Sequence, residues 1–306
     1  MSRIYDALQR ADLERQAAQG KDAIENPEPY FEPGSEDLPP VEVGVSLEKA
    51  VMRSWKPSLV SLPTLGDRGE GIEQFRALRT QFYQFRDQNP LKTILVSSGA
   101  PAEGKTFVVA NLAVSLARNR NNTVLLIDAD LRRPALHAIL GAPSTPGLTE
   151  YLAGTAEVSD ILQRNDNPRI VEGGNMHAMP DLAFIPAGAG GDNSSELVAN
   201  HRIEELVAAL SPHFDWILID SPPVLAFADA IDLARAADAV LLVARGASTP
   251  FDVAQRAQAA FASSRILGYV LNAVKETPRR SSYYYDYGKQ DGSIGPSSRK
   301  DKRRQG

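Results

Sequence analysis

The sequence of 306 residues contains no cysteine, so neither disulfide bonds nor thiolate metal sites are available to it. It has no apolar run near the roughly 18 to 20 residues that a helix needs to cross a bilayer. Charges at Asp6, Arg10 and Asp12 stand where a signal peptide would be apolar. The formal net charge of -5 gives no reason to expect a nucleic acid partner. We therefore expect a cytoplasmic protein that reaches the inner face of the cell membrane only through a partner.

The stretch from Thr93 to Asn111 combines a strand-like apolar run, a glycine loop and the start of a helix. The loop reads Gly99-x-x-x-x-Gly104-Lys105-Thr106, which is the spacing of a phosphate-binding loop in the strand-to-helix setting that the motif requires. Backbone amides and the helix N-terminus suit phosphate oxygens, Lys105 suits the terminal phosphates, and the Thr106 hydroxyl suits Mg2+. We therefore predict that ATP and Mg2+ bind here. The predicted nucleotide-binding residues of the loop are Gly99, Ala100, Pro101, Ala102, Glu103, Gly104, Lys105, Thr106 and Phe107.

Apolar runs alternate with helical patterns after this loop, which predicts an α/β fold. The runs are continuous rather than alternating in polarity, which indicates strands buried on both faces. We predict a mostly parallel sheet flanked by helices, with ligands at the carboxyl ends of the strands. Besides the strand that begins at Thr93, the expected strands are residues 123–127, 182–186, 216–219, 239–244 and 266–271, and the expected helices are residues 200–210, 228–236 and 251–263.

Carboxylates follow two of these strands. Asp128 and Asp130 lie in LLIDADLRRP, and Asp220 lies in ILIDSPP. Mg2+ prefers oxygen ligands and retains several waters, so a carboxylate is needed near Thr106. Asp220, after four apolar residues, has the position of the metal-side carboxylate of a phosphate-loop NTPase. A lone aspartate at a strand end is otherwise often a helix cap or a turn residue.

Composition divides the whole chain into four segments. Residues 1–19 show an amphipathic helical pattern, which fits a helix packed on the core and a docking handle for another protein equally well. Residues 20–65 are rich in Pro, Glu and Gly with little periodicity, which predicts a disordered linker. Residues 66–276 are predicted as the compact phosphate-loop domain, and residues 277–306 as a flexible tail rich in tyrosine and basic residues.

The compact domain is expected to begin with a helix, because apolar residues between 75 and 85 repeat at intervals of three and four. Glu73, Arg76 and Arg79 share a neighbouring stripe of that helix. Such a stripe is by default a solvated charged face with intrahelical ion pairs. The functional alternative is a salt-bridged contact to an adjacent subunit.

The tail contains a tyrosine cluster in an otherwise polar segment, SSYYYDYG. The segment cannot bury Tyr283, Tyr284, Tyr285 and Tyr287 together, so a core role does not explain them. A disordered adhesive segment is one interpretation, and a set of phosphate acceptors is the other.

The motifs SSGAPAEGKT, VLLIDADLRRP and ILIDSPP, in this order, resemble those of the bacterial tyrosine kinases (BY-kinases). The resemblance extends through GLTEYL, FIPAG and NSSEL and covers about residues 70 to 290. It implies a ParA/MinD-like P-loop NTPase scaffold, autophosphorylation of the C-terminal tyrosines and regulation of exopolysaccharide or capsule synthesis. It also implies that Glu73, Arg76 and Arg79 mediate assembly of a homo-oligomeric ring. A membrane-embedded activator, the polysaccharide co-polymerase, and a partner tyrosine phosphatase are implied as well.

A carboxylate beside the acceptor hydroxyl, whose pKa is near 10, would help to remove its proton. We assign Asp128 as the base with a contribution to the metal, Asp130 as support for the acceptor or a metal water, and Asp220 as the Mg2+ carboxylate. Lys105 would stabilise charge on the transferred group. Asn272, after the final expected strand, is a candidate adenine contact.

Two other functions are alternatives to the kinase, and the first of them shares its fold and much of its motif order. An ATPase switch of the ParA and MinD type would carry a further lysine five residues before Lys105, where this chain has Ala100. Those switches also lack a tyrosine tail. An ATP-binding regulatory scaffold without kinase activity is the second alternative, and the intact lysine, threonine and three aspartates argue against it.

Overall fold

The computed structural model describes residues 50–66, 69–119, 122–167, 169–172, 175–178, 180–190 and 194–274. The predicted helix in residues 1–19 and the tyrosine tail lie outside these residues. Residues 20–49 of the predicted linker also lie outside the described residues.

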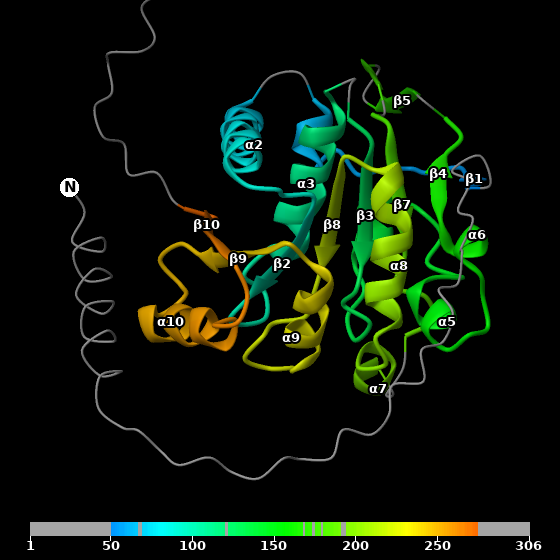
Figure 1. Ribbon diagram of the computed structural model, residues 1–306. Coiled ribbons are helices and arrows are strands. Elements are labelled where there is room, and N and C mark those ends of the chain that lie inside the picture. Colours follow the sequence, from blue (N-terminus) through cyan, green and yellow to red (C-terminus); the bar gives the residue numbers. More distant parts are fainter. Residues whose placement is uncertain are drawn as a thin grey trace, which may run out of the picture. The chain divides into compact units, whose positions relative to one another are not determined.

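An eight-stranded sheet forms the centre of the described part of the chain, in the order β1-β4-β7-β3-β8-β2-β9-β10 (Figure 1). All neighbouring strands run parallel except β4 and β7, which pair antiparallel. A separate two-stranded sheet joins β5 to β6. The strands are β1 (Val51–Arg53), β2 (Thr93–Ser98), β3 (Val124–Asp128), β4 (Gln163–Asn165), β5 (Arg169–Glu172), β6 (Asn175–Ala178), β7 (Leu182–Ile185), β8 (Trp216–Asp220), β9 (Ala239–Arg245) and β10 (Ile266–Asn272).

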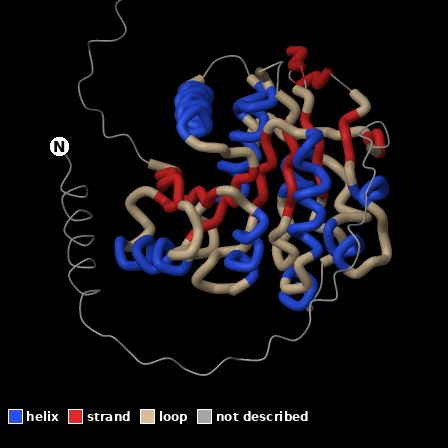
Figure 2. The backbone as a smooth tube through the Cα atoms, viewed as in Figure 1, coloured by secondary structure: helices blue, strands red, loops and turns tan. Residues whose placement is uncertain are grey.

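Helices cover both faces of the large sheet, as the blue and red segments of Figure 2 show. The α-helices are α2 (Glu70–Gln88), α3 (Lys105–Ala117), α4 (Leu136–Leu140), α5 (Leu148–Leu152), α6 (Val158–Ile161), α7 (Ser194–Val198), α8 (Arg202–Leu210), α9 (Asp229–Leu233) and α10 (Phe251–Ala260). Short 3-10 helices are η2 (Pro63–Leu65), η3 (Ser211–His213) and η4 (Ala234–Ala236). The predicted α/β fold with a mostly parallel sheet is confirmed.

Alternate residues of the buried strands face two separate hydrophobic cores. In β2, Ile94 packs in the core that contains α2 and α3, whereas Leu95 packs in the core that contains α5 and α8. The helices supply matching stripes: in α8 the buried residues Ile203, Leu206 and Val207 recur at helical spacing. Burial on both faces explains why these strands read as continuous apolar runs.

The prediction that residues 20–65 form a disordered linker is wrong for residues 50–65. β1 pairs with β4, and Trp55, Leu62 and Leu65 are buried in the core beside α3. This segment has no helical or strand periodicity because it contributes isolated apolar side chains. It is ordered by the surface that the rest of the domain presents to it, so the domain boundary predicted at residue 66 was too late.

Within the described residues, no helix has the length and apolar character that crossing a bilayer requires.

Candidate active site

The phosphate loop connects β2 to α3 at the carboxyl end of the sheet, as the motif predicts. Gly104 has φ +93° and caps α3, and Ala102 also has a positive φ of +63°. A β-carbon at Gly104 would lie 2.0 Å from Asn272 Nδ2, and one at Gly99 would lie 2.9 Å from Val253 Cγ1. Both glycines therefore allow close packing of the loop against β10 and α10.

Lys105 opens α3 and reaches two of the predicted carboxylates. Its Nζ lies 2.8 Å from Asp130 Oδ2 and 3.8 Å from Asp220 Oδ1. Burial by itself would lower the pKa of Lys105, but the negative charges of Asp220 and Asp130 outweigh burial and raise that pKa. The structure thus brings the loop lysine and strand-end acids from β3 and β8 into one buried cluster.

Asp128 and Asp220 end two neighbouring parallel strands and stand opposite one another in the register of β3 and β8. Both side chains are fully buried. Burial, and then the charge of Asp220, raises the pKa of Asp128 to about 8. Burial also raises the pKa of Asp220 to about 6, against the opposing charge of Lys105. Because the two carboxylates are close, they titrate as a pair.

The two oxygens of Asp128 have different surroundings. Oδ2 accepts backbone N–H bonds from Ala135 at 3.1 Å and Leu136 at 3.0 Å, where α4 begins. Oδ1 accepts a longer bond of 3.3 Å from the Asp130 amide. Asp128 therefore also fixes the chain that follows β3, a structural role that sequence reasoning raised for lone strand-end aspartates.

Asp220 differs from Asp128 in having no such support. Among the described residues, no backbone N–H donates to either of its buried oxygens, and the Thr106 hydroxyl lies close enough to favour the charged form and so lower its pKa. No set of three or more His, Asp or Glu side chains in the described part of the chain is arranged to hold a metal by itself. Mg2+ does not need such a set, because it takes one or two carboxylates plus water and phosphate. Asp220 and the Thr106 hydroxyl fit that requirement.

Three of the predicted nucleotide-binding residues, Ala100, Phe107 and Asn272, make specific contacts within the protein. The Ala100 amide donates to Glu103 Oε2 at 2.9 Å. The Phe107 ring packs against Phe75 of α2, with ring centroids 6.0 Å apart. Asn272 Nδ2 donates to the Glu103 carbonyl at 3.0 Å, so the predicted adenine contact lies directly on the loop.

The stripe of Glu73, Arg76 and Arg79 on α2 lies away from the phosphate loop. Arg79 donates to the Ser115 carbonyl near the C-terminal end of α3, whereas the loop precedes the N-terminal end of that helix. Arg76 pairs with Glu73 at 2.6 Å, and both side chains are exposed. The intrahelical pair expected from the sequence is present, and the surface is open to a further contact. The tyrosine cluster lies outside the described residues.

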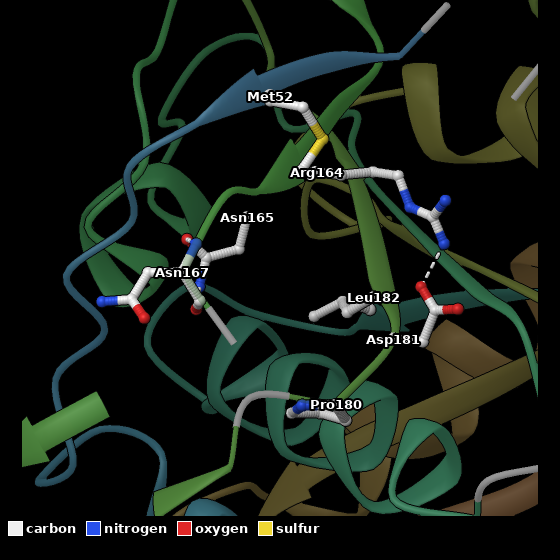
Figure 3. A pocket seen from close by; sticks show the side chains of 7 residues that line it. All are labelled: Met52, Arg164, Asn165, Asn167, Pro180, Asp181 and Leu182. Atoms are coloured by element: carbon white, nitrogen blue, oxygen red, sulfur yellow. Dashed lines mark hydrogen bonds and ion pairs between the residues drawn. The ribbon is translucent and has the colours of Figure 1, made fainter. Parts of the chain in front are cut away.

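A surface cavity of about 270 Å³ lies at the β1 edge of the sheet, on strands that do not carry the candidate site (Figure 3). Arg164 and Asp181 form an ion pair across it. Its other lining residues are Met52, Asn165, Asn167, Pro180 and Leu182.

The sequence analysis missed two contacts that join distant parts of the chain, one of them on the phosphate loop. Thr249 donates its hydroxyl to Glu103, and Arg132 after β3 donates to Asp229 of α9 at 3.0 Å. Arg132 also lies over the Phe227 ring, 4.4 Å from its centre. The basic pair in DLRRP was a visible signal for the second contact, but nothing in the sequence marked Thr249.

Comparison with known proteins places this geometry in a family. Residues 91–249 match the family described as AAA domain. The chain is 32% identical over 221 residues to the tyrosine-protein kinase YwqD of Bacillus subtilis, covering 72% of this chain and 87% of that protein. It is also 32% identical to the tyrosine-protein kinase CpsD of Streptococcus agalactiae, covering 72% of this chain and 90% of the relative. The chain belongs to the bacterial tyrosine-protein kinases.

A solved structure from this bacterial tyrosine kinase family has the same fold. The kinase domain of the Escherichia coli tyrosine kinase ETK superposes with a TM-score of 0.62 at 29% identity, covering 80% of this chain and 89% of that domain. The tyrosine-protein kinase wzc of Salmonella typhimurium is 33% identical over 219 residues, which are 71% of this chain. The match spans 28% of the length of that Salmonella protein.

Proposed function

We propose that this chain is an ATP-dependent protein-tyrosine autokinase that phosphorylates tyrosines of its own C-terminal cluster. The observation that carries the proposal is the contact of Lys105, on a phosphate loop, with Asp130 and its approach to Asp220, in a member of the tyrosine kinase family. An ATPase switch and a scaffold without catalysis would use the same loop. The relatives are named tyrosine-protein kinases, which favours the kinase.

The roles of the residues follow from their surroundings. Lys105 and the first amides of α3 would bind the phosphates, and Thr106, Asp220 and Asp128 would hold Mg2+. When bound, Mg2+ supplies positive charge to the β- and γ-phosphates. When the nucleotide binds, Lys105 would leave Asp130 and contact the phosphates. Asp130 would then support the tyrosine acceptor.

Asp128 is our proposed base. Burial raises the pKa of Asp128, so its carboxylate, once ionised, is a stronger proton acceptor than an ordinary one, which suits a tyrosine hydroxyl with a pKa near 10. Oδ1 carries the longer of its hydrogen bonds and is the oxygen that would take the proton. The γ-phosphoryl group of ATP would move to the phenolic oxygen, ADP would leave, and the phenolic proton would move to the carboxylate.

The chain connects the site to its proposed acceptors. Asn272 contacts the phosphate loop, and Tyr283 follows it by 11 residues. Such a length spans at most about 40 Å when fully extended. This length would let a tail tyrosine reach its own site or that of a neighbouring subunit.

The decisive experiment is phosphotyrosine mapping by mass spectrometry after purified protein is incubated with Mg2+ and ATP. We expect phosphate on Tyr283, Tyr284, Tyr285 or Tyr287, and none in Lys105→Met, because the charge on the transferred group loses its stabilisation. Lys56→Met, at an exposed lysine outside the site, is the matched control and should label as wild type does. Full labelling of Lys105→Met would contradict the proposed mechanism.

Mixing variants then separates the two destinations. Lys105→Met supplies intact tyrosines without catalysis, and a variant with all four tyrosines replaced by phenylalanine supplies catalysis without acceptors. Label on the Lys105→Met chain in the mixture shows transfer between subunits. Absence of label in the mixture, with wild type labelled, shows transfer within one chain.

We also propose that Glu73 and Arg76 contribute to a homo-oligomeric ring, together with Arg79. Their exposed pair on α2 supports this, because both side chains are accessible to a second copy. Sedimentation of a variant with Glu73→Ala and Arg76→Ala should show loss of the oligomer, while Gln74→Ala on the same helix should not. An unchanged oligomer would exclude this surface.

The wider role that we propose is control of exopolysaccharide or capsule synthesis at the inner face of the cell membrane. A membrane-embedded activator of the polysaccharide co-polymerase type would recruit the kinase, and a tyrosine phosphatase would reverse the modification. Polymer production in cells that carry only Lys105→Met tests this role. Normal polymer amount and length in those cells would contradict it.

A further inference from the structure

Glu103 presents an electrostatic problem within the phosphate loop. Its side chain is 4% exposed and carries a carboxylate into a loop that would bind a polyanion. A negative charge close to phosphate oxygens opposes their binding, especially where water is excluded. The residue therefore needs a role that offsets this effect.

Both oxygens of Glu103 are directed to protein donors. Oε2 accepts the Ala100 N–H at 2.9 Å, within the loop itself, and Oε1 accepts the Thr249 hydroxyl. The first contact closes the loop on its own backbone. The second ties the loop to the turn that follows β9, almost 150 residues later in the chain.

That turn is itself held in one shape around Thr249. The Thr249 N–H donates to the Arg245 carbonyl at 2.9 Å, and the Thr249 hydroxyl oxygen accepts the Arg245 N–H at 2.7 Å. The Arg245 side chain returns to the loop, where Nη1 donates to the Ala102 carbonyl at 3.4 Å. The hydroxyl of Thr249 thus joins the loop and the turn through one oxygen.

The loop between these contacts has a backbone that needs support. Ala102 has φ +63°, a region that costs a non-glycine residue on the order of 1 kcal/mol and persists only where the surroundings impose it. Asn272 adds a second support from β10 by donating to the Glu103 carbonyl. Each of these contacts joins two groups of the protein, so none of them needs a ligand in order to form.

We infer that Glu103 and Thr249 are positioning residues that hold the phosphate loop in its nucleotide-accepting shape. The inference rests on the proposed function, since it assumes that the loop binds ATP. A loop that is ordered in advance binds more tightly because less freedom is lost on binding. Glu103 acts through the backbone of the loop and does not contact the nucleotide.

The test is nucleotide affinity, measured by fluorescence titration with a methylanthraniloyl derivative of ADP. Thr249→Val keeps the shape of the side chain and removes the hydroxyl, so we expect affinity about tenfold weaker. Thr249→Ser restores the hydroxyl and should restore affinity. Ser248→Ala, at the exposed neighbouring hydroxyl, is the matched control and should bind as wild type does.

A double-variant cycle shows whether the two residues act together. Glu103→Ala should also weaken binding, by a smaller factor because it removes an opposing charge as well as the support, and adding Thr249→Val to it should cause little further loss. The KM for ATP should rise in both single variants while kcat changes much less. The melting temperature of each variant is measured without nucleotide. Affinities measured well below that temperature come from folded protein, so a weaker affinity there is not caused by general destabilisation.

The outcomes distinguish this inference from the proposed function. Wild-type protein that fails to bind the ADP derivative would contradict the proposed function itself. Wild-type binding with an equal affinity in Thr249→Val, or with no recovery in Thr249→Ser, would overturn the positioning role alone. Additive losses in the double variant would also overturn it.

Discussion

Two cation–carboxylate contacts in this molecule have the same chemistry and different environments. Lys105 and Asp130 lie at the carboxyl end of the sheet with side chains 12% and 6% exposed. Arg164 and Asp181, in the cavity at the β1 edge, are 28% and 56% exposed. Solvent screens the second pair, whereas the first lies among further buried acids. The comparison teaches that burial, more than the pairing itself, decides how far solvent screens an ionic contact.

The largest effect should come from Asp130→Asn, which removes the carboxylate that holds Lys105. We expect phosphotransfer to fall at least about tenfold, because an acid of the site is lost. ATP binding without Mg2+ should become several-fold tighter, because Lys105 no longer exchanges a charged hydrogen bond for the phosphates. Isothermal titration and a phosphotransfer assay measure the two quantities separately.

Asp87→Asn removes the same charge from an exposed position of α2 and serves as the control for the effects on phosphotransfer and on ATP binding. ATP binding that is unchanged or weaker in Asp130→Asn would contradict competition between Asp130 and the phosphates for Lys105.

A smaller effect is expected in the pH dependence of stability without metal or nucleotide. The pKa values of Asp128 and Asp220 are raised to about 8 and about 6 in the folded chain, so the folded state holds protons that the unfolded state releases. Stability from these protons is complete below about pH 4 and is lost as the pH rises towards 8. Asp128→Asn keeps an acceptor for the Ala135 and Leu136 amides, so it should be more stable than wild type at pH 8.

Denaturant unfolding at pH 4 and pH 8 measures this difference, with EDTA present throughout. At pH 4 the two proteins should have nearly equal stability, which provides an internal control. A wild-type advantage at pH 8 would show that Asp128 is stabilised as an anion, contrary to the raised pKa.

The smallest effect is expected at the exposed pair. Asp181→Asn should change the free energy of unfolding by less than about 0.5 kcal/mol, because solvent screens the pair with Arg164. Thermal melting at low salt and at high salt checks this, and the small difference should vanish at high salt. A loss above 1 kcal/mol would show that exposure is a poor guide to the strength of these contacts.

Much of the fold was predictable because its strands are buried on both faces. Continuous apolar runs located β2, β3, β7, β8, β9 and β10, and the periodic helices α2 and α8 were predicted as well. The edge strand β1 and the short strand β4 were missed, because three residues carry too little pattern. Residues 50–65 were mistaken for a linker because their buried side chains, such as Trp55, have no regular spacing.

The candidate site was predictable where a local motif carries the chemistry. The loop from Gly99 to Thr106 and the acids Asp128, Asp130 and Asp220 follow from strand ends and glycine spacing. It was not predictable that Asp130 would pair with Lys105, or that Asp128 would accept backbone N–H bonds and Asp220 would not. These contacts depend on which neighbouring groups the folded chain brings to each oxygen.

The sequence by itself determined that a phosphate loop and three strand-end acids would meet at one edge of a parallel sheet. It did so because parallel strands present their carboxyl ends on the same side. Only the tertiary structure decided that Lys105 turns to Asp130, that Asp220 accepts no backbone N–H bond and that Thr249 reaches Glu103. These outcomes arise from side chains far apart in the sequence, whose contacts depend on packing, and no local pattern records them.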